Sequence, residues 1–327
     1  MPSADKPDML AILDSYPMQI NEALLLGKGI KFSGIGRVLV CGMGGSAIAG
    51  DILKAYLSDK IEVGVTKDYD IPLFVNKKTL AFIISYSGST EETISAYEKC
   101  RKKGAKIAII SSGGELERLA GKDKTAFIKV PAGLPPRLAT PCLFFPMLNI
   151  LQQSGLIRGK GSEIRGVPEQ LERIRQDYKK DAKNIAKKLA GKIPIIYASQ
   201  RYFPAAEKWK TDINENAKTH AFFNIFPEFN HNEINGYVNL NGSFHAIMLK
   251  DDNEDPMIEK RMKIVKGLIE EKGVPVIEVK IKGNSYLSGL FSAIYLGLYV
   301  SYFLALELNT NPTPVEIIEK LKKRLKD

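Results

Sequence analysis

The chain has 327 residues, of which 44% are hydrophobic and 26% are charged, close to the values of ordinary globular proteins. This composition excludes a disordered, collagen-like or fibrous chain, and the length suggests two domains or one large one. The formal net charge is +10, and residues 158–192 and 320–327 hold the whole excess, without the interleaved aromatic residues or recognition motif of a nucleic-acid binder. We therefore expect solvated basic helix faces that attract anionic small molecules, and no nucleic-acid partner.

Short apolar runs in the first half of the chain predict buried strands, and helical patterns separate them. The strands are expected at residues 37–41, 80–84, 106–110 and 126–130, and helices at 46–57 and 91–103. Alternation of this kind is typical of a parallel sheet with helices on both faces.

Residues 158–192 are charged and helical in pattern, so we expect a connector helix there. The alternation then restarts, with strands expected at 193–197, 244–249 and 275–281 and helices at 205–218 and 255–272. The predicted fold class is therefore α/β, with two doubly wound parallel-sheet subdomains in three α/β/α layers. We expect the N-terminal subdomain over residues 1–157 and the C-terminal one, which ends in a basic helix, over 193–327.

The segment Leu287–Leu306 carries no charge over about 20 residues, which is long enough to cross a bilayer. It stands alone, contains three Ser and three Tyr, and comes late in the α/β pattern. We therefore expect a helix buried inside a domain or at a subunit interface, and no membrane association.

The cysteines and the first residues favour a cytoplasmic location. Cys41, Cys100 and Cys142 have no C-x-x-C spacing, which argues against a disulfide framework and a zinc site. Residues 1–6 are polar and do not resemble a secretory signal.

Two loops rich in glycine or hydroxyl groups follow predicted strands directly, where open parallel sheets bind their ligands. Residues 42–47 (GMGGSA) formally fit the G-x-G-x-x-G/A dinucleotide pattern, and their backbone amides can approach an anion at a helix N-terminus. Residues 85–90 (SYSGST) place four Ser or Thr and a glycine before the next helix. Helix capping explains one or two of these hydroxyls but not the whole run. We predict that both loops hold one phosphate, through Gly45, Ser46, Ser85, Ser87 and Thr90.

The sequence GMGGSAIAGD (42–51), followed about 40 residues later by SYSGSTEET (85–93), resembles a sugar isomerase (SIS) domain, a family that binds phosphosugars through a Ser/Thr-rich loop. With LPPR (134–137), NEN (214–216), NHNE (230–233) and LK (321–322), nearly the whole chain resembles the bifunctional phosphoglucose/phosphomannose isomerases. The resemblance implies two SIS-type subdomains in a homodimer. It also implies a cofactor-free enzyme that interconverts glucose 6-phosphate and fructose 6-phosphate, and mannose 6-phosphate as well.

Such an isomerisation needs a base that moves a proton between C1 and C2 and a group that stabilises the enediolate. Arg137, in a Pro-rich loop, suits the second task because a guanidinium stabilises developing negative charge, and the resemblance implies this role. Glu215 would ordinarily be a solvated helix residue, but the resemblance implies that it is the base. Because a useful base needs its pKa moved toward the working pH, we expect Glu215 to be mostly buried in a cleft.

The remaining candidates rest mainly on the resemblance. His231 suits ring-oxygen proton transfer near neutral pH, and the resemblance implies that it reaches a neighbouring subunit's site. The resemblance implies that Lys322 assists ring opening. Other lysines lie nearby, so which of them takes this role is left open. Thr313 is implied to let the C2–C3 bond rotate and so admit both epimers. No metal is expected, because the sequence has no compact His/Asp/Glu cluster at ligand spacing.

Two alternatives stay open. A non-catalytic sugar-phosphate-binding regulator would keep the phosphate loops without needing Glu215, His231 and Arg137 together. A Rossmann-type NAD-dependent dehydrogenase would rest on residues 42–47 and would need an acidic residue that closes the second strand, for which Asp68 is a candidate.

Overall fold

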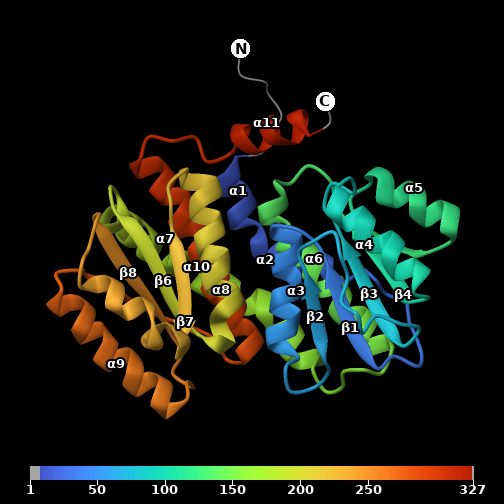
Figure 1. Cartoon of the computed structure of the whole chain (residues 1–327), viewed down its shortest axis with the longest axis horizontal. Helices are drawn as coiled ribbons and strands as arrows, with labels where there is room; N and C mark the ends of the chain where they lie inside the picture. Colours follow the sequence, from blue (N-terminus) through green and yellow to red (C-terminus); the bar gives the residue numbers. More distant parts are fainter. Residues whose placement is uncertain (1–7, 326–327) are drawn as a thin grey trace. The chain divides into compact units, whose positions relative to one another are not determined.

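The computed structural model describes residues 8–325, which form two compact units, each built on its own parallel sheet (Figure 1). Unit 1 comprises residues 11–173 and 283–291, and unit 2 comprises 8–10, 174–282 and 292–325. The predicted α/β fold class with two parallel-sheet subdomains is confirmed. Helix α7 (Gly161–Leu189) lies within the predicted connector, and the division between the units falls inside it. The limits at residues 157 and 193 stay a prediction.

Unit 1 contains a five-stranded sheet in the order β2-β1-β3-β4-β5, with every neighbouring pair parallel. The strands are β1 (Arg37–Cys41), β2 (Val63–Thr66), β3 (Thr79–Ile84), β4 (Lys106–Ser111) and β5 (Ala126–Lys129). Every residue of the central strand β3 is buried. A continuous apolar run of this kind is typical of a parallel strand that is covered on both faces.

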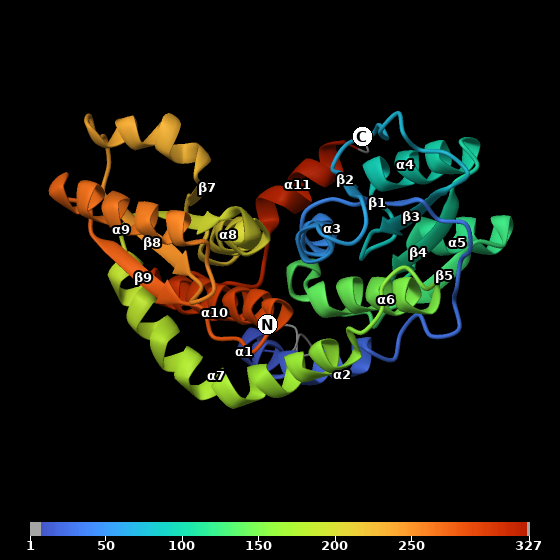
Figure 2. The same ribbon diagram turned by 90° about the horizontal axis from the view of Figure 1, so that it is seen from below.

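Helices cover both faces of this sheet (Figure 2). The helices are α1 (Met9–Asp14), α2 (Tyr16–Ala23), α3 (Gly45–Tyr56), α4 (Glu91–Lys102), α5 (Gly114–Asp123) and α6 (Thr140–Gln153). On one face, Tyr97 of α4 and Leu116 of α5 pack in one cluster with Ile83 and its neighbours. On the other face, α3 lies so close that a Cβ added to Gly50 would be 2.8 Å from the Val40 side chain.

Unit 2 contains a four-stranded parallel sheet in the order β7-β6-β8-β9. The strands are β6 (Ile193–Ser199), β7 (Phe222–Phe226), β8 (Phe244–Lys250) and β9 (Val276–Lys280), and the helices beside them are α8 (Phe203–Asp212) and α9 (Pro256–Glu271). Met262 and Ile269 of α9 pack against the face that carries Tyr197 and Met248. The crossovers through α8 and α9 run in opposite directions across the sheet, so right-handed connections place these helices on opposite faces.

Helix α10 (Tyr286–Glu307) forms the apolar support of α8. The indole Nε1 of Trp209 donates to the carbonyl of Ala293 at 2.7 Å, and a Cβ on Gly297 would lie 2.4 Å from the Trp209 ring. Within residues 8–325, α10 is the one helix long and apolar enough to span a membrane, and 94% of its apolar window is buried inside the structure. This burial is what the sequence predicts for a core helix.

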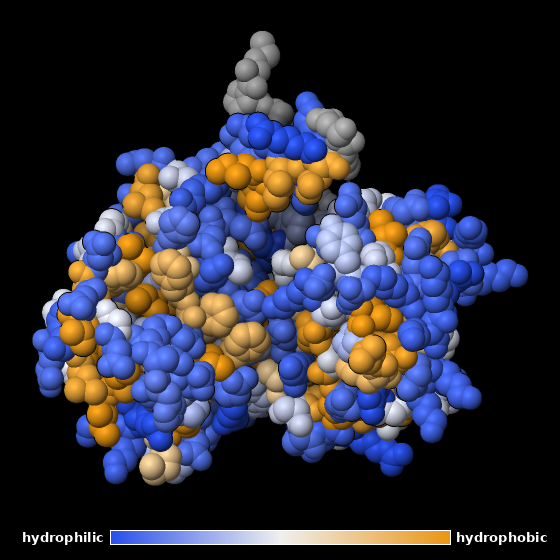
Figure 3. All heavy atoms as spheres, in the orientation of Figure 1, coloured by the Kyte–Doolittle hydropathy of each residue, from blue (hydrophilic) through white to orange (hydrophobic). Residues whose placement is uncertain are grey.

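The predicted basic C-terminal helix is present as α11 (Glu316–Arg324). Figure 3 shows hydrophobic side chains gathered along one face of this helix and hydrophilic ones along the other. Ile317 is 83% exposed and Leu321 57% exposed, and Lys322 lies beside them on the same short helix.

Candidate active site

The two predicted phosphate loops follow neighbouring strands at the point where the sheet of unit 1 changes direction. Strand β1 pairs with β2 on one side and with β3 on the other, so consecutive connections leave β1 and β3 in opposite directions. Loop 42–44 begins at the carboxyl end of β1, and loop 85–90 begins at the carboxyl end of β3. In open α/β sheets this switch point is where ligands bind.

The hydroxyl groups of the second loop converge on Ser85, which is only 2% exposed. Its Oγ lies 2.9 Å from the Thr90 Oγ1 and 3.5 Å from the Ser87 Oγ, and it accepts a hydrogen bond from the Gly88 amide at 3.1 Å. Thr90 occupies the N-cap of α4, yet its side chain makes no cap hydrogen bond. Capping therefore does not account for this hydroxyl cluster.

The first loop is joined to the second by a side chain. Ser46 is the second residue of α3 rather than its N-cap, which is Gly44. The Ser46 Oγ accepts a hydrogen bond from the Tyr86 amide at 3.3 Å, across 40 residues of sequence. The N-termini of α3 and α4 and their loops thus form one connected surface of hydroxyl and amide groups.

Arg137 lies against the first loop within unit 1. It occupies a 3₁₀ turn, Pro136–Leu138, and is only 3% exposed. The backbone of Gly45 packs so tightly on this turn that an added Cβ would lie 2.9 Å from the Pro136 carbonyl oxygen and 3.2 Å from the Arg137 Cα. The structure therefore brings Gly45 and Ser46 next to the backbone of Arg137, and the roles of these residues stay a prediction.

Tyr86 is a positioning residue that the sequence analysis missed. Its hydroxyl donates to the Pro131 carbonyl at 2.8 Å and accepts from the Leu134 amide at 2.8 Å. It thereby fixes the segment that leads into the turn of Arg137, and burial raises the pKa of the Tyr86 phenol. The available signal was an aromatic residue inside a run of Ser and Gly.

Glu215 belongs to unit 2 and lies on an unusual turn. The helix predicted over 205–218 is present, but its α-helical part, α8, ends at Asp212, and the helix continues as a π-helical turn, Ile213–Ala217, which the sequence did not predict. Such turns are rare and frequently mark functional sites. The Glu215 side chain is partly buried, and its enclosure in a cleft stays a prediction.

Buried polar contacts hold this π-helical turn in place. Lys208 and Asp212, each 1% exposed, form an ion pair one turn before it. The Asn216 side-chain amide donates to the Ser301 Oγ of α10 at 2.9 Å, and this bond is also buried. Removing one partner of a buried pair leaves an uncompensated group, so these contacts strongly constrain where the turn lies.

His231 lies on an exposed 3₁₀ turn, Glu228–His231, that is anchored on both sides. Phe229 stacks on Tyr197 with ring centroids 4.3 Å apart. The Glu233 carboxylate accepts hydrogen bonds from the Tyr197 hydroxyl at 2.8 Å and the Asn224 amide at 2.6 Å. The backbone around His231 is therefore fixed while its imidazole stays accessible.

Glu215 and His231 lie near opposite ends of the strands in the sheet of unit 2. Strands β6 and β7 are parallel, so α8 runs back across the sheet and delivers the turn of Glu215 to the amino end of β7. His231 follows the carboxyl end of the same strand. The structure therefore does not bring these two residues together within one unit 2.

Thr313 and Lys322 complete the predicted set. Thr313 lies between α10 and α11, where its amide donates to the Asn311 Oδ1 at 3.0 Å. The neighbouring Pro312 carbonyl accepts a hydrogen bond from Lys218, which follows the turn of Glu215, so the Thr313 loop lies beside that turn. Lys322 is exposed on α11.

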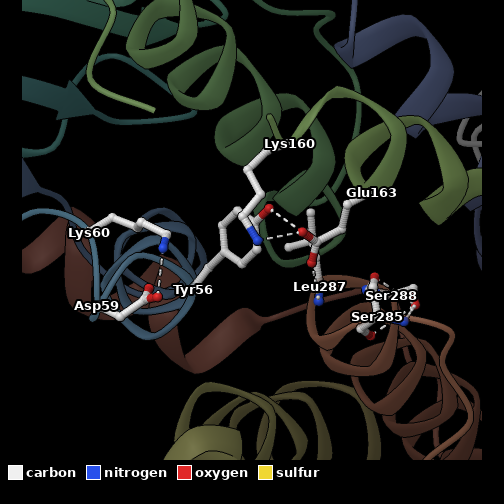
Figure 4. A network of polar contacts seen from close by, with 8 residues as sticks. All are labelled: Tyr56, Asp59, Lys60, Lys160, Glu163, Ser285, Leu287 and Ser288. Carbon is white, nitrogen blue, oxygen red and sulfur yellow. Dashed lines mark hydrogen bonds and ion pairs between the residues drawn. The ribbon is translucent and has the colours of Figure 1, made fainter. Parts of the chain in front are cut away.

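Unit 1 also contains a polar cavity of about 510 Å³ between one face of α7 and the start of α10. Beside it, the Glu163 carboxylate accepts hydrogen bonds from Lys160 at 2.7 Å, from the Tyr56 hydroxyl at 3.1 Å and from the Leu287 amide at 3.3 Å (Figure 4). The residues that line this cavity include none of the predicted site residues. Within residues 8–325, no group of three or more His, Cys, Asp or Glu side chains is arranged to hold a metal ion.

Two family models match the chain. The SIS domain model matches residues 31–129, and the model of the bacterial phospho-glucose isomerase C-terminal SIS domain matches residues 178–325. A bifunctional phosphoglucose/phosphomannose isomerase from Caldicellulosiruptor bescii is 42% identical over 95% of this chain and 97% of its own length. One from Thermoplasma acidophilum is 37% identical over 96% and 100%. A D-glucosamine-6-phosphate 4-epimerase from Sulfolobus acidocaldarius is 32% identical over 88% and 89%.

Solved structures share the fold at low sequence identity. The C-terminal domain of glucosamine-fructose-6-phosphate aminotransferase from Francisella tularensis gives a TM-score of 0.74 at 17% identity, covering 95% of this chain and 99% of that one. Tagatose-6-phosphate ketose/aldose isomerase from Escherichia coli gives 0.68 at 14% identity, covering 93% and 89%.

The dehydrogenase alternative loses its support at Asp68. The sheet order differs from the 3-2-1-4-5-6 order of the dinucleotide-binding fold. The Asp68 carboxylate is exposed and accepts a hydrogen bond from the adjacent Tyr69 amide at 2.6 Å. The glycine loop 42–47 lies within residues 31–129, which the SIS domain model matches.

Proposed function

Because this chain belongs to the bifunctional phosphoglucose/phosphomannose isomerase family of SIS-domain proteins, we propose that it converts both glucose 6-phosphate and mannose 6-phosphate to fructose 6-phosphate through a cis-enediolate. Membership makes the chain a sugar-phosphate isomerase, which is an intramolecular oxidoreductase. The reaction moves a proton and an electron pair within one sugar, so no external oxidant is consumed.

The joined loops of unit 1 are the observation that carries this proposal. Hydroxyls of Ser46, Ser85 and Thr90 gather with backbone amides at the N-termini of two long helices. Helix N-termini and hydroxyl donors suit a phosphate without any lysine or arginine on the loops. The turn of Arg137 packs on Gly45, and we assign its buried guanidinium to the stabilisation of the enediolate.

The proposed chemistry assigns a separate task to each remaining residue. Glu215 removes the C2 proton of the open-chain aldose and returns it to C1, while the proton of the O2 hydroxyl passes to O1, which together give the ketose. Arg137 stabilises the negative charge that develops on the enediolate oxygens. His231 and Lys322 move protons at the ring oxygen and the anomeric hydroxyl during ring opening, and Thr313 permits the C2–C3 rotation that admits both epimers.

The position of His231 supports a homodimer. Glu215 and His231 lie at opposite ends of β7, a strand of five residues, which corresponds to about 16 Å of chain. A hexose is too short to contact both ends of such a strand. We therefore assign the histidine of each site to the other subunit, and this needs a two-fold arrangement of copies.

Replacing Glu215 by glutamine tests the proposed base. The variant keeps a polar side chain of the same shape but cannot accept the proton, so kcat for fructose 6-phosphate formation should fall about 1000-fold with little change in KM. Glu259→Gln, on the solvent-facing start of α9, is the matched control and should keep full activity. More than a tenth of the wild-type activity in Glu215→Gln would exclude this role.

The same assay separates the alternatives for the whole protein. Fructose 6-phosphate formed from both aldose phosphates without added nucleotide supports the proposal. Tight phosphosugar binding without turnover would instead indicate a regulator. Epimerisation of D-glucosamine 6-phosphate at C4, with no activity on the other two sugars, would place the chain with its Sulfolobus relative.

Mixing two inactive variants tests the shared site. In a dimer of Glu215→Gln with His231→Ala, one site loses both groups and the other keeps both. Random reassembly should then restore about a quarter of the wild-type activity, because half of the dimers are mixed and each carries one intact site. No recovery after proven subunit exchange would show that both residues act from one chain.

A further inference from the structure

Lys218 joins two segments that the proposed function uses, although they are far apart in the sequence. Its ammonium group donates to the carbonyl of Glu215, to that of Asn216 at 3.3 Å and to that of Pro312 at 3.2 Å. The first two carbonyls belong to the π-helical turn, and the third lies 94 residues away, directly before Thr313.

The backbone at Lys218 is adapted to this contact. Lys218 is the C-cap of the π-helical turn and adopts the left-handed conformation, with φ of +56°. A residue other than glycine, asparagine or aspartate rarely takes this conformation, because its Cβ crowds the backbone. The last carbonyls of a helix have no partner inside it, and a positively charged side chain favours that end.

We propose that Lys218 is a positioning residue that holds the turn of Glu215 against the loop of Thr313 and thereby sets the ratio of mannose 6-phosphate to glucose 6-phosphate activity. This inference rests on the proposed function, in which Glu215 serves both sugars and Thr313 serves the change between epimers. Lys218 itself need not touch the substrate.

The two sugars depend differently on this contact. Glu215 stays fixed by the Asn216 to Ser301 bond and by the ion pair that precedes it, so proton transfer survives the loss of Lys218 in part. The Thr313 loop loses its bond through Pro312 to the turn. The mannose 6-phosphate reaction needs Glu215 and Thr313 in a fixed relative position. Its kcat/KM should therefore fall more than that of the glucose 6-phosphate reaction.

Lys218→Met and Lys218→Gly test the inference together. Methionine keeps the stem of the side chain without the ammonium group, and glycine also relieves the left-handed backbone. Because a misplacement of 1 Å can cost about 100-fold in rate, we expect the ratio of the two kcat/KM values to fall about tenfold in both variants. The matched control is Lys124→Met, since Lys124 is also an exposed left-handed helix C-cap, at the end of α5 in unit 1.

The outcomes distinguish this inference from the function on which it rests. If both Lys218 variants lose the two activities in equal proportion, or lose neither, the inference is overturned and the proposed function stands. If Lys124→Met changes the ratio equally, the effect does not belong to the contact of Lys218. A wild-type chain that does not convert both sugars overturns the proposed function and this inference with it.

Discussion

Replacing Gly45 by alanine tests whether the contact between the first phosphate loop and the turn of Arg137 matters for catalysis. The new Cβ would lie 2.9 Å from the Pro136 carbonyl oxygen, whereas ordinary contacts begin at 3.4 Å. The two segments must therefore separate by about half an ångström, because the crowded atoms are backbone and no side chain can rotate away. Overpacking of this kind costs about 1–3 kcal/mol, reduced by the ~0.5–1 kcal/mol that alanine gains over glycine in a helix.

The expected kinetic effect is larger than the effect on folding. Since about 1 Å of misplacement can cost 100-fold, half an ångström between Arg137 and the phosphate should lower kcat/KM for glucose 6-phosphate about tenfold. The assay couples fructose 6-phosphate formation to a spectrophotometric signal, and urea unfolding measures the remaining stability. Gly121→Ala on α5 is the control, since nothing lies within 4 Å of its added Cβ, and it should keep full activity. A folded Gly45→Ala protein with kcat/KM within twofold of wild type would refute the reasoning.

Two further substitutions test contacts that stabilise the interior of each unit separately. Gly297→Ala places a Cβ 2.4 Å from the ring of Trp209 and should lower the free energy of unfolding in urea by about 3 kcal/mol. Burial tends to raise the pKa of Glu163, but hydrogen bonds from Lys160 and the Leu287 amide outweigh it, so the pKa lies below its ordinary value. Glu163→Gln should therefore cost about 1–2 kcal/mol at pH 7. This difference should shrink as the pH falls below about 4.3 and through the folded-state pKa, where the wild-type carboxylate also becomes neutral.

The same urea titrations can contradict both stability predictions. Gly267→Ala on α9 adds a methyl group in open space and should be neutral or slightly stabilising in the same urea titration. A Gly297→Ala protein as stable as Gly267→Ala would contradict the close packing of α8 on α10. A stability difference for Glu163→Gln that stays constant from pH 7 to pH 3 would contradict the ionic role of Glu163.

The sequence predicted the buried central strands of both sheets and missed one edge strand of each sheet. Strands β1, β3 and β4 form continuous apolar runs, because both of their faces are covered. The missed strands, β2 and β7, lie at sheet edges, and most of their residues are only partly buried. An edge strand with one open side has no need of an unbroken apolar run, so the run alone cannot identify it.

Helix α6 was missed for the opposite reason. Eleven of its fourteen residues are buried, so it shows no alternation of polar and apolar faces, and Pro146 inside it resembles a helix breaker. Without that contrast, periodicity does not distinguish a buried helix from a buried loop.

The sequence shows that the two loops are rich in glycine and hydroxyl groups, but it does not show whether these hydroxyls cap a helix or bind a ligand. Ser and Thr at a helix start serve either as caps or as ligand donors, and both uses favour the same residues. Only the coordinates show that the Thr90 hydroxyl meets Ser85 and makes no cap hydrogen bond. The aromatic character of Tyr86 stood out in the loop, but the sequence could not show its role, which is a pair of hydrogen bonds to residues 45 and 48 positions further along the chain.

Glu215 does not follow the carboxyl end of a strand, unlike the two predicted phosphate loops. The carboxyl ends of parallel strands lead into helix N-termini, which stabilise negative charge. That environment suits a phosphate, as predicted for the loops after β1 and β3, but it makes a carboxylate a weaker proton acceptor. Glu215 instead lies beyond the C-terminal end of α8, on the π-helical turn that continues this helix. The switch-point rule therefore predicts where an anion site lies in unit 1, but it does not predict the position of Glu215.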